Sequence, residues 1–447
     1  MILKAILALS LAAACGCSTL PTIDPEAGSR PSQAVQLDGA RGPLSAQQSK
    51  AVLERLASSG EETGIFERHL ALEGRIAGSP LVVGNRVLLL KDGPATYAAM
   101  FQAIAAARDH IHMETYIIED DEVGRKFADA LIARRAQGVR VALIYDGLGS
   151  IGTPGAFFKR LTDAGVDVAE FNTVNPNHRD HRKILIIDGR TAFVGGVNIS
   201  SVYSKGGASR SSPDSADAMR WRDTHLRIEG PVVAEFQKLF LATWDKQKGE
   251  ALSARSSYPP PASPGHEVVR AVASSPDEPY SLVYATLLSA IASAETDVYL
   301  TNAYFVPDPQ LMAALMDAAR RGVNVKLVLP AKTDSWIVFH AGRAHFEDLL
   351  EAGVKIYERR DAMLHAKTAV IDGVWSTVGS SNLDWRSFLH NEEVVAIVLG
   401  QEFGAQMQSM FEADIEASDL ITKKSWSHRP LTNHVQEMAA QVWSYWL

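Results

Sequence analysis

The feature that most constrains the fold of this chain is a short pattern, His-x-Lys-x4-Asp, which occurs twice, 184 residues apart. Its two copies consist of His181, Lys183, Asp188, His365, Lys367 and Asp372. If residues 181–187 form a strand, the two-residue period of a strand places the histidine and the lysine on one face. The two side chains would then point together into one site.

The residues that follow each copy also match. Asp188 and Asp372 each precede a glycine, and Asp-Gly is a dipeptide that closes a hairpin into the next strand. The next apolar run ends each time in small residues and an asparagine, Asn198 or Asn382. Bare backbone at these positions leaves room for a bulky ligand group.

Strand and helix patterns alternate in both halves of the chain. The predicted elements of the first half are a strand at 87–90, a helix at 97–107, a strand at 110–118, a helix at 123–136 and a strand at 139–145. Those of the second half are a helix at 284–294, a strand at 297–303, a helix at 310–320 and a strand at 323–329. This order predicts an internally duplicated α/β chain with a largely parallel sheet that is covered on both faces.

The paired motifs with their Gly-Gly-x-Asn and Gly-Ser-x-Asn flanks resemble the signature of the phospholipase D superfamily. Residues 75–425 are similar to its bacterial cardiolipin synthases, and most of all to the C type. The resemblance implies two tandem α/β/α sandwich domains, related by a pseudo-twofold axis, with one shared active site. The predicted limits are 1–17 for a signal and anchor, 18–75 for a tether and short helix, 76–250 for the first domain, 251–266 for a Pro/Ser-rich linker and 267–447 for the second domain.

A phosphodiester substrate would explain why two lysines accompany the two histidines. Its negative charge repels a nucleophile, so the charge must be neutralised before attack. Lys183, Lys367 and the amides of Asn198 and Asn382 are the donors that can hold the non-bridging oxygens. The chemistry that the resemblance implies needs no metal and no cofactor.

The two histidines divide the catalytic work. One attacks phosphorus and forms a phosphohistidine, and the other protonates the leaving alcohol and deprotonates the incoming one. The resemblance assigns attack to His181 and acid–base work to His365, although the sequence alone does not separate two nearly equivalent copies. It also assigns Asp223 and Glu393 as the acids that orient the imidazoles, with Glu392 as the competitor to Glu393.

Other polar residues near the motifs have simpler interpretations. Asp188 and Asp372 belong to the motif, but the pattern favours turn and salt-bridge roles over chemistry. His178 and Asp180 could suggest metal ligation, but no compact second set of ligands accompanies them. The histidines at 225, 340, 345 and 390 are interpreted as structural.

The first 17 residues have one lysine, a short apolar stretch and then small residues, which is typical of a secretory signal and too short to span a bilayer. Both cysteines of the protein, Cys15 and Cys17, lie here. The sequence after them resembles a bacterial lipoprotein processing site, with Cys17 as the lipidated residue and Cys15 as the alternative. We therefore expect a lipid-anchored, periplasm-facing protein of the bacterial cell envelope. Ser18 favours the outer membrane by the same resemblance.

The net charge of the protein narrows the range of functions that the sequence allows. The net charge of -8 and pI of about 5.9 argue against a protein that mainly binds nucleic acid. The resemblance implies a phosphatidyltransferase that makes cardiolipin at a membrane surface, from phosphatidylglycerol or phosphatidylethanolamine as donor and phosphatidylglycerol as acceptor. The alternatives are a phospholipase D that releases phosphatidic acid, a phosphodiesterase or nuclease, and a non-catalytic lipid-binding lipoprotein.

Three further segments are candidates for lipid contact. The run at 336–339 follows a predicted strand end and is expected to line an acyl-chain groove. Residues 442–446 contain an aromatic cluster that suits either a membrane interface or packing onto the second domain. The polar segment at 204–212 is either a loop or a lid at the lipid entrance.

Overall fold

A computed structural model describes residues 37–57, 68–69, 79–171, 175, 177–206, 220–248, 252, 258–259, 262–443 and 447. The predicted signal and lipidation site at Cys17, with its alternative Cys15, lie outside these residues. So do most of the predicted lid, half of the predicted linker and the last aromatic residues of the C-terminal cluster.

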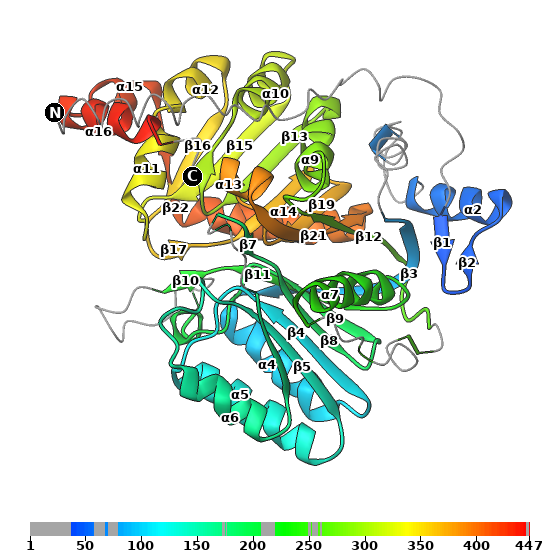
Figure 1. The fold of residues 1–447 in the computed structure, drawn as a ribbon. Helices are drawn as coiled ribbons and strands as arrows, with labels where there is room; N and C mark the ends of the chain where they lie inside the picture. Colours follow the sequence, from blue (N-terminus) through cyan, green and yellow to red (C-terminus); the bar gives the residue numbers. More distant parts are fainter. Residues whose placement is uncertain are drawn as a thin grey trace.

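The two halves are built from the same series of elements (Figure 1). Those of the first half are β3 (Leu81–Lys91), α4 (Gly93–Ala106), β4 (His110–Thr115), α5 (Glu122–Ala136), β5 (Arg140–Asp146), α6 (Gly155–Asp163), β6 (Asp167–Phe171), β8 (Lys183–Ile187), β9 (Thr191–Gly195), β11 (Thr224–Glu229) and α7 (Val233–Lys248). Their counterparts in the second half are β12 (Glu267–Ser274), α9 (Leu282–Ser293), β13 (Asp297–Asn302), α10 (Pro309–Arg320), β15 (Asn324–Pro330), α12 (Phe346–Ala352), β16 (Lys355–Arg359), β18 (Lys367–Ile371), β19 (Trp375–Gly379), β21 (Asn391–Leu399) and α14 (Gln401–Glu416). The duplication predicted from the motifs extends to every one of these elements.

Each half has a mixed sheet rather than the largely parallel sheet that we predicted. The strand order in the first half is β6-β5-β4-β8-β9-β11-β3, and β16-β15-β13-β18-β19-β21-β12 repeats it in the second. Along these two orders, parallel neighbours occur only among β4, β5 and β6 and among β13, β15 and β16, because helices connect these strands. A three-residue turn joins β8 to β9, and such a short connection forces antiparallel pairing.

One apolar core joins the two halves. Helices α7 and α14 lie between the sheets, while α4 to α6 cover the outer face of one sheet and α9, α10 and α12 that of the other (Figure 1). Phe236 and Phe240 of α7 pack in one buried cluster with Phe403 and Met407 of α14 and with strands of both halves. Strands β3 and β12 also pair across the boundary, so the two sheets are continuous.

The strands alternate between this shared core and the outer layers. In β8, Ile184 and Ile186 face the shared core, whereas Leu185 and Ile187 face α4 to α6. The apolar run within the first motif is therefore buried on both faces of its sheet. The polar motif residue that precedes the run, His181, lies where the two halves meet.

The remaining elements are short or peripheral. They are β1 (Leu37–Gly39), β2 (Gly42–Pro43), α2 (Ala46–Ala57), β7 (Arg179–Asp180), the 3₁₀ turn Ser201–Tyr203, β10 (Trp221–Arg222), β14 (Phe305–Val306), α11 (Trp336–Arg343), β17 (Met363–Leu364), β20 (Leu383–Asp384), α13 (Trp385–Leu389), β22 (Ser418–Ile421), α15 (Lys423–Ser427) and α16 (Leu431–Gln441). Helix α2 lies where the short helix was predicted, but the hairpin of β1 and β2 was not predicted. Within the described residues, every helix is too short or too polar to cross a bilayer.

Candidate active site

Two short parallel strand pairs bring the motifs of the two halves together. Strand β7 of the first half pairs with the start of β21 of the second, and β10 of the first half pairs with β17 of the second. The amide of His181 then donates to the carbonyl of Glu392 at 3.0 Å, and the amide of His365 donates to that of Arg222 at 2.8 Å. The chain thus places each motif histidine beside a strand of the other half. Strand β8 begins at Lys183, so His181 precedes the strand in which we had placed it.

Each histidine contacts a carboxylate from the opposite half. Nδ1 of His181 lies 3.0 and 3.1 Å from the two carboxylate oxygens of Glu393. Nδ1 of His365 lies 2.6 Å from Oδ2 of Asp223. An Nδ1–H that donates to a carboxylate fixes the tautomer and leaves Nε2 as the nitrogen available for chemistry. These are the two acids predicted to orient the imidazoles, and the pairing crosses between the halves.

Burial sets the charge state of these pairs. It lowers the pKa of His181 to about 4, against the opposing effect of Glu393, so the imidazole is neutral at pH 7. Burial alone would raise the pKa of Glu393, but the charge and hydrogen bond of His181 and the charge of Lys183 lower it to about 2. The pKa of His365 is also lowered by burial and by Lys367. The site therefore combines ionised acids with neutral imidazoles.

Each motif lysine donates a hydrogen bond to the backbone carbonyl of the histidine two residues before it. Nζ of Lys183 donates to the carbonyl of His181 at 2.6 Å and lies 5.1 Å from the centre of the Tyr116 ring. Lys367 makes the equivalent hydrogen bond to the carbonyl of His365. Burial lowers the pKa of Lys183 to about 7 and that of Lys367 to about 8, and the positive charge of Lys367 also lowers that of Lys183. In their protonated forms, the two amines can stabilise an anion bound near the histidines.

Both histidines line one cavity of about 390 Å³ at the boundary between the halves. The other residues that line it are Tyr116, Ile117, Arg179, Asn198, Tyr203, Trp221, Tyr304, Asp334, Ser335, Val338, Asn382, Asp384, Arg386, Asn391 and Leu447. A cavity of this size takes a ligand of a few hundred daltons. Histidine, asparagine and arginine side chains from both halves suit an anionic phosphate group.

The two predicted asparagines are held differently. Oδ1 of Asn198 accepts from the amide of Ile117 at 3.3 Å, and its Nδ2 donates to the hydroxyl of Tyr203 at 3.1 Å. Asn382 has a buried Oδ1 without a hydrogen-bond partner among the described residues. Asn198 is therefore part of the fixed wall of the cavity, which Asn382 also lines.

Aromatic side chains near the histidines were missed by the sequence reasoning. The hydroxyl of Tyr203 lies 3.2 Å from Nδ1 of His365, and the rings of Trp221 and Tyr304 lie against the same imidazole. Tyr116 meets His181 edge to face at 4.9 Å. The predicted strand 110–118 ran through Tyr116, whereas β4 ends at Thr115, so a correct strand end would have indicated this residue.

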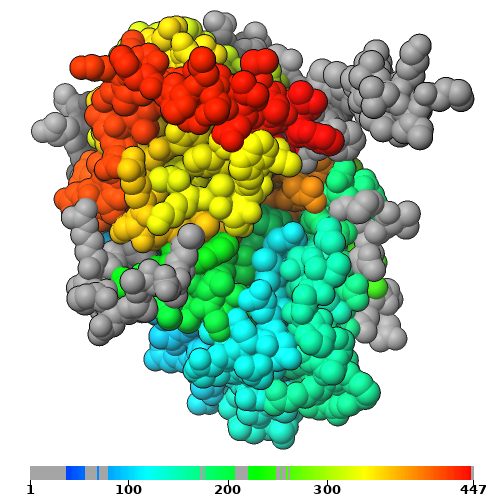
Figure 2. All heavy atoms as spheres, turned by 90° about the vertical axis from the view of Figure 1, so that its left-hand side faces the viewer, coloured from blue at the N-terminus to red at the C-terminus, as the bar shows by residue number. Residues whose placement is uncertain are grey.

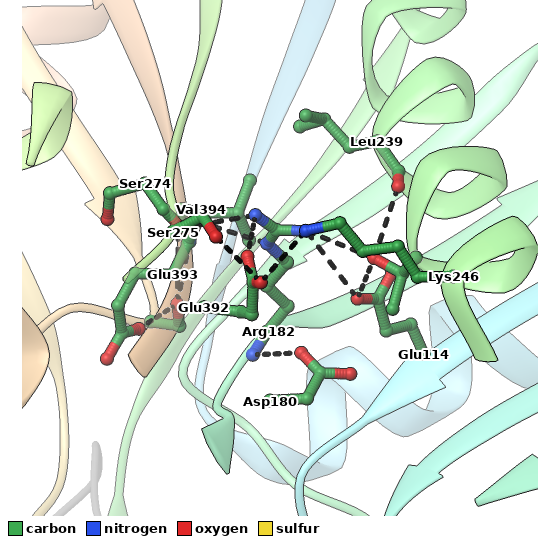
Figure 3. Close-up of polar contacts among 12 residues, drawn as sticks. Glu114, Asp180, Arg182, Leu239, Lys246, Ser274, Ser275, Glu392, Glu393 and Val394 are labelled. Carbon is green, nitrogen blue, oxygen red and sulfur yellow. Dashed lines mark hydrogen bonds and ion pairs between the residues drawn. The ribbon is translucent and has the colours of Figure 1, made fainter. Parts of the chain in front are cut away.

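Arg182, between the histidine and lysine of the first motif, was also missed. Its guanidinium donates to the carboxylate of Glu392 at 2.7 Å and to the carbonyls of Glu393 and Ser274 at 3.2 and 3.1 Å (Figure 3). Arg182 and Glu392 are both almost fully buried. Glu392, the competitor for the orienting role, therefore pairs with Arg182, while Glu393 turns to His181.

This ionic group has no counterpart in the second motif, where the position of Arg182 is occupied by buried Ala366. Behind Arg182 lie Glu114 and Asp180, and burial raises the pKa of both, that of Glu114 to about 7 (Figure 3). Near the second histidine, the buried ion pairs are made instead by Asp414, which contacts Arg222 and Arg359.

A second asymmetry follows from Gly196, which has Ser380 as its counterpart. The hydroxyl of Ser380 donates to Glu393 at 2.5 Å. A side chain at Gly196 would collide with Asp223, since an added Cβ would lie 2.1 Å from Oδ1. Glycine in the first half therefore leaves space for one acid, and serine in the second half holds the other.

The two motif aspartates lie outside the cavity, at the opposite ends of β8 and β18 from the histidines. Asp188 and Asp372 have φ angles of 53° and 52°, a turn conformation that aspartate tolerates. The Asp188 carboxylate accepts from the amides of residues 108–110, and that of Asp372 from the amides of residues 295–297. Both therefore act as structural acceptors in the hairpins. This is the turn role that the sequence pattern favoured over chemistry.

The other residues singled out in the sequence lie outside the two histidine–carboxylate pairs. His178 contacts Glu392 at 3.3 Å, and His225 is buried in the sheet, where neither ring nitrogen has a hydrogen-bond partner in the described part of the chain. The run at 336–339 does not form the predicted acyl-chain groove. Trp336 is exposed, Val338 lines the catalytic cavity, and the cavity beside Phe339 has only about 20 Å³.

Comparison with known proteins agrees with this arrangement. A family model described as "Cardiolipin synthase, PLD-like domain" matches residues 100–204 and 287–415, one segment in each half. The chain is 35% identical over 384 residues to a cardiolipin synthase of Alkalihalophilus pseudofirmus, covering 83% of this chain and 74% of that protein. It is 34% identical over 405 residues to a cardiolipin synthase of Geobacillus thermodenitrificans, covering 89% and 78%.

A third relative, cardiolipin synthase A of Pseudomonas putida, is 34% identical over 379 residues and covers 82% of this chain and 76% of its own length. Among solved structures, the phosphatidylserine synthase of Haemophilus influenzae superposes with a TM-score of 0.63 at 12% identity, covering 85% of this chain and 100% of that one. This likeness concerns the fold. It supports the two-domain organisation expected from the paired motifs.

Proposed function

Because this chain belongs to the cardiolipin synthase family of proteins with phospholipase D-like domains, we propose that it is a phosphatidyltransferase that makes cardiolipin. The observation that carries this proposal is the crossed pairing at the cavity. His181 is held by Glu393 and His365 by Asp223, each from the other half, at distances of 3.0 and 2.6 Å. Two oriented imidazoles beside two lysines are the parts that a double displacement at a phosphodiester needs.

In the first step, Nε2 of neutral His181 attacks the phosphorus of the donor phospholipid. A P–N bond forms, the P–O bond to the headgroup alcohol breaks, and His365 gives a proton to the departing oxygen. The bound phosphodiester is an anion and favours the protonated form of His365, opposing the effect of burial on its pKa. Lys183 and Lys367 stabilise the charge on the non-bridging oxygens.

In the second step, His365 takes the proton from a free glycerol hydroxyl of phosphatidylglycerol as that oxygen attacks phosphorus. The P–N bond to His181 breaks and the phosphatidyl group is transferred. Two molecules of phosphatidylglycerol give one cardiolipin and one glycerol, and phosphatidylethanolamine as donor would release ethanolamine instead. Water as acceptor would give phosphatidic acid by the same route.

The finer assignments of substrate and place rest on the sequence. We propose phosphatidylglycerol as acceptor, in line with the family, and a membrane surface as the place of reaction. We also propose a lipid anchor at Cys17 in a bacterial cell envelope, facing the periplasm. Mass spectrometry of the N-terminal peptide from membranes of the producing cell tests this anchor, and an unmodified Cys17 in the mature chain would contradict it.

The phosphohistidine tests the proposed chemistry. We expect rapid quenching of the protein with ³²P-labelled phosphatidylglycerol to leave an acid-labile, base-stable label on the native protein. His181→Ala should carry none. Asp188→Asn, which changes a motif residue outside the cavity, is the matched control and should be labelled like the native protein. Equal labelling of His181→Ala would rule out attack by this histidine.

A further inference from the structure

Helix α16 carries a narrow apolar stripe that faces solvent. Leu431, Val435, Met438 and Val442, the last immediately after the helix end, follow the spacing i, i+4, i+7 and i+11, which places them on one face. Their exposure ranges from 67% to 82%. Four large apolar residues aligned in this way form a contiguous surface patch, unlike apolar residues scattered singly over a surface.

The opposite face of α16 is the one that packs on the protein. Glu437 is buried there and pairs with Arg429 at 3.0 Å. Ala440 is buried with Ala341 of α11 and Val306 of β14. An amphipathic helix normally turns its apolar stripe toward the core. Here the small and polar residues face the core, so the stripe remains available for something outside the chain.

The C-terminal segment that carries the stripe also reaches the rim of the catalytic cavity. Helix α16 packs on α11, whose Trp336 and Ile337 are exposed while Val338 lines the cavity. Trp443 is exposed just beyond the stripe, and Leu447 lines the cavity. Figure 2 shows the C-terminal segment in red and the segment around α11 in yellow on one face, above a hollow between the two halves.

The volumes of the cavities indicate where the acyl chains of a bound lipid substrate lie. The catalytic cavity of about 390 Å³ suits a headgroup and its phosphate rather than a whole diacyl lipid. The apolar cavity beside Lys367 has about 40 Å³, which is room for about one water molecule. A lipid whose phosphate reaches the histidines therefore keeps its chains outside these cavities, in an apolar phase next to the rim.

The charge of this segment matches an anionic lipid surface. The protein has a net charge of -8, but residues 423–447 contain three basic side chains, Lys423, Lys424 and Arg429, and one acidic side chain, Glu437, a balance of +2. Lys423 and Lys424 of α15 are exposed. Basic residues beside an apolar stripe with tryptophan are the combination that binds the interface of anionic bilayers.

We propose that the stripe of α16, together with Trp443, Trp336 and Ile337, is a docking surface for an anionic phospholipid bilayer. Docking brings the rim of the catalytic cavity against the headgroups, so that a substrate enters without leaving the bilayer. This inference rests on the proposed function for the nature of the substrate. The surface itself is defined by exposure and packing, independently of catalysis.

A fluorescent label on the stripe tests docking without any reaction. The full chain with Cys15→Ser and Cys17→Ser has no native cysteine, so Val435→Cys can be labelled selectively with nitrobenzoxadiazole. Lys126→Cys, on the exposed surface of α5 in the other half, is the control. On phosphatidylglycerol vesicles we expect the emission of the label at 435 to shift to the blue and that of the label at 126 to stay unchanged.

Charged substitutions test the importance of docking for turnover. Val435→Asp with Met438→Asp should lower turnover of phosphatidylglycerol vesicles at least tenfold, and leave turnover of soluble bis(4-nitrophenyl) phosphate unchanged. Thr432→Asp with Gln441→Asp adds the same charge to exposed positions beside the stripe. This control should keep both activities within about twofold of the native protein.

Two results would overturn the proposal. One is a label at 435 that remains in water while the protein is bound to phosphatidylglycerol vesicles. The other is a blue shift without vesicles that grows with protein concentration, which would identify a second copy as the occupant. If the native protein turns over neither substrate, the proposed function fails, and the label still decides whether the surface docks.

Discussion

At the first motif histidine, burial and a carboxylate act on one pKa in opposite directions. Burial lowers the pKa of His181 to about 4, and the negative charge and hydrogen bond of Glu393 raise it from a still lower value. Glu393 itself is ionised above pH about 2. In the acid range, the imidazole is therefore the group of this pair that changes charge.

This assignment predicts the acid limb of the pH profile. Attack needs neutral His181, so kcat/KM on a soluble phosphodiester should rise with pH through about 4, where the imidazole loses its proton. Glu393→Gln removes the charge that raises this pKa, so the limb should move to lower pH while the rate falls about 100-fold. Steady-state kinetics between pH 3 and 7 measures both effects.

Asp223→Asn is the matched control, because Asp223 contacts the other histidine. It should lower the rate but leave the acid limb in place. If the limb of Glu393→Gln stayed where it is in the native protein, His181 would not be the titrating group.

At this scale, sequence reasoning could find the residues but not their partners. The repeated pattern identified His181, His365 and both lysines, and the resemblance supplied Asp223 and Glu393. Crossed pairing could not be predicted, because it depends on β7 and β10, strands of two residues each that leave no periodicity in a sequence. The aromatic wall around His365 gave no signal either, since Trp221 and Tyr203 lie outside the repeated motif.

At the scale of single elements, the motif aspartates belong to the hairpins and not to the chemistry. Asp188→Ala removes an acceptor from three backbone amides at the start of β4 and forces alanine into a positive φ. We expect a loss of about 1–3 kcal/mol in the free energy of unfolding. Turnover per folded molecule should change less than twofold, because the residue lies outside the cavity. Urea unfolding measures the change in stability, and an activity assay on the same samples measures the turnover per folded molecule.

Asp188→Asn is the control for this prediction, since asparagine keeps an acceptor oxygen and tolerates the same backbone conformation. It should cost clearly less stability than alanine. A large loss of kcat in well-folded Asp188→Ala would instead place the aspartate in the catalytic machinery.

The ion pair of Arg182 and Glu392 joins the segment between β7 and β8 of the first half to β21 of the second. Arg182→Met removes the buried cation that contacts Glu392 and Glu114, and we expect a loss of about 3–5 kcal/mol of stability. Adding Glu392→Gln removes one of these charges and should restore part of the loss. A double-mutant cycle on urea unfolding measures this coupling. Additive effects of the two substitutions would show that the pair does not join the halves.

The positions of the secondary-structure elements were predicted well where the sequence shows a helical period or a long apolar strand. Helices α4, α5, α9 and α10 lie within a few residues of their predicted places. The sheet was wrongly predicted as largely parallel, because the reasoning gave weight to the helical connections and too little to the Asp-Gly turns. Those turns join β8 to β9 and β18 to β19 as antiparallel hairpins.

Over the whole molecule, the shared core makes the two halves dependent on each other. Helices α7 and α14 bury phenylalanine and methionine side chains against both sheets, and β3 continues into β12. We expect the chain to unfold in one transition rather than two. Trp221 to Phe and Trp375 to Phe, in separate variants, allow tryptophan fluorescence to be compared with circular dichroism. Distinct midpoints for the two probes would contradict a shared core.

Duplication was visible in the sequence at this scale, whereas the contact between the copies was not. A motif repeated after 184 residues implies two similar units, but either a face-to-face pair or two separate domains would satisfy it. The side chains that decide the matter, such as Ile184, Phe236 and Met407, are apolar residues that any buried core could contain. Only their packing into one cluster distinguishes a shared core from two.

The most direct test of the account is a product measurement. Purified protein is incubated with vesicles of phosphatidylglycerol, and the lipids are identified by mass spectrometry beside His181→Ala and His365→Ala. We expect cardiolipin, with one glycerol released for each molecule formed, from the native protein and none from either variant. Phosphatidic acid without cardiolipin would contradict transfer and indicate hydrolysis, and cardiolipin from either variant would contradict the two-histidine site.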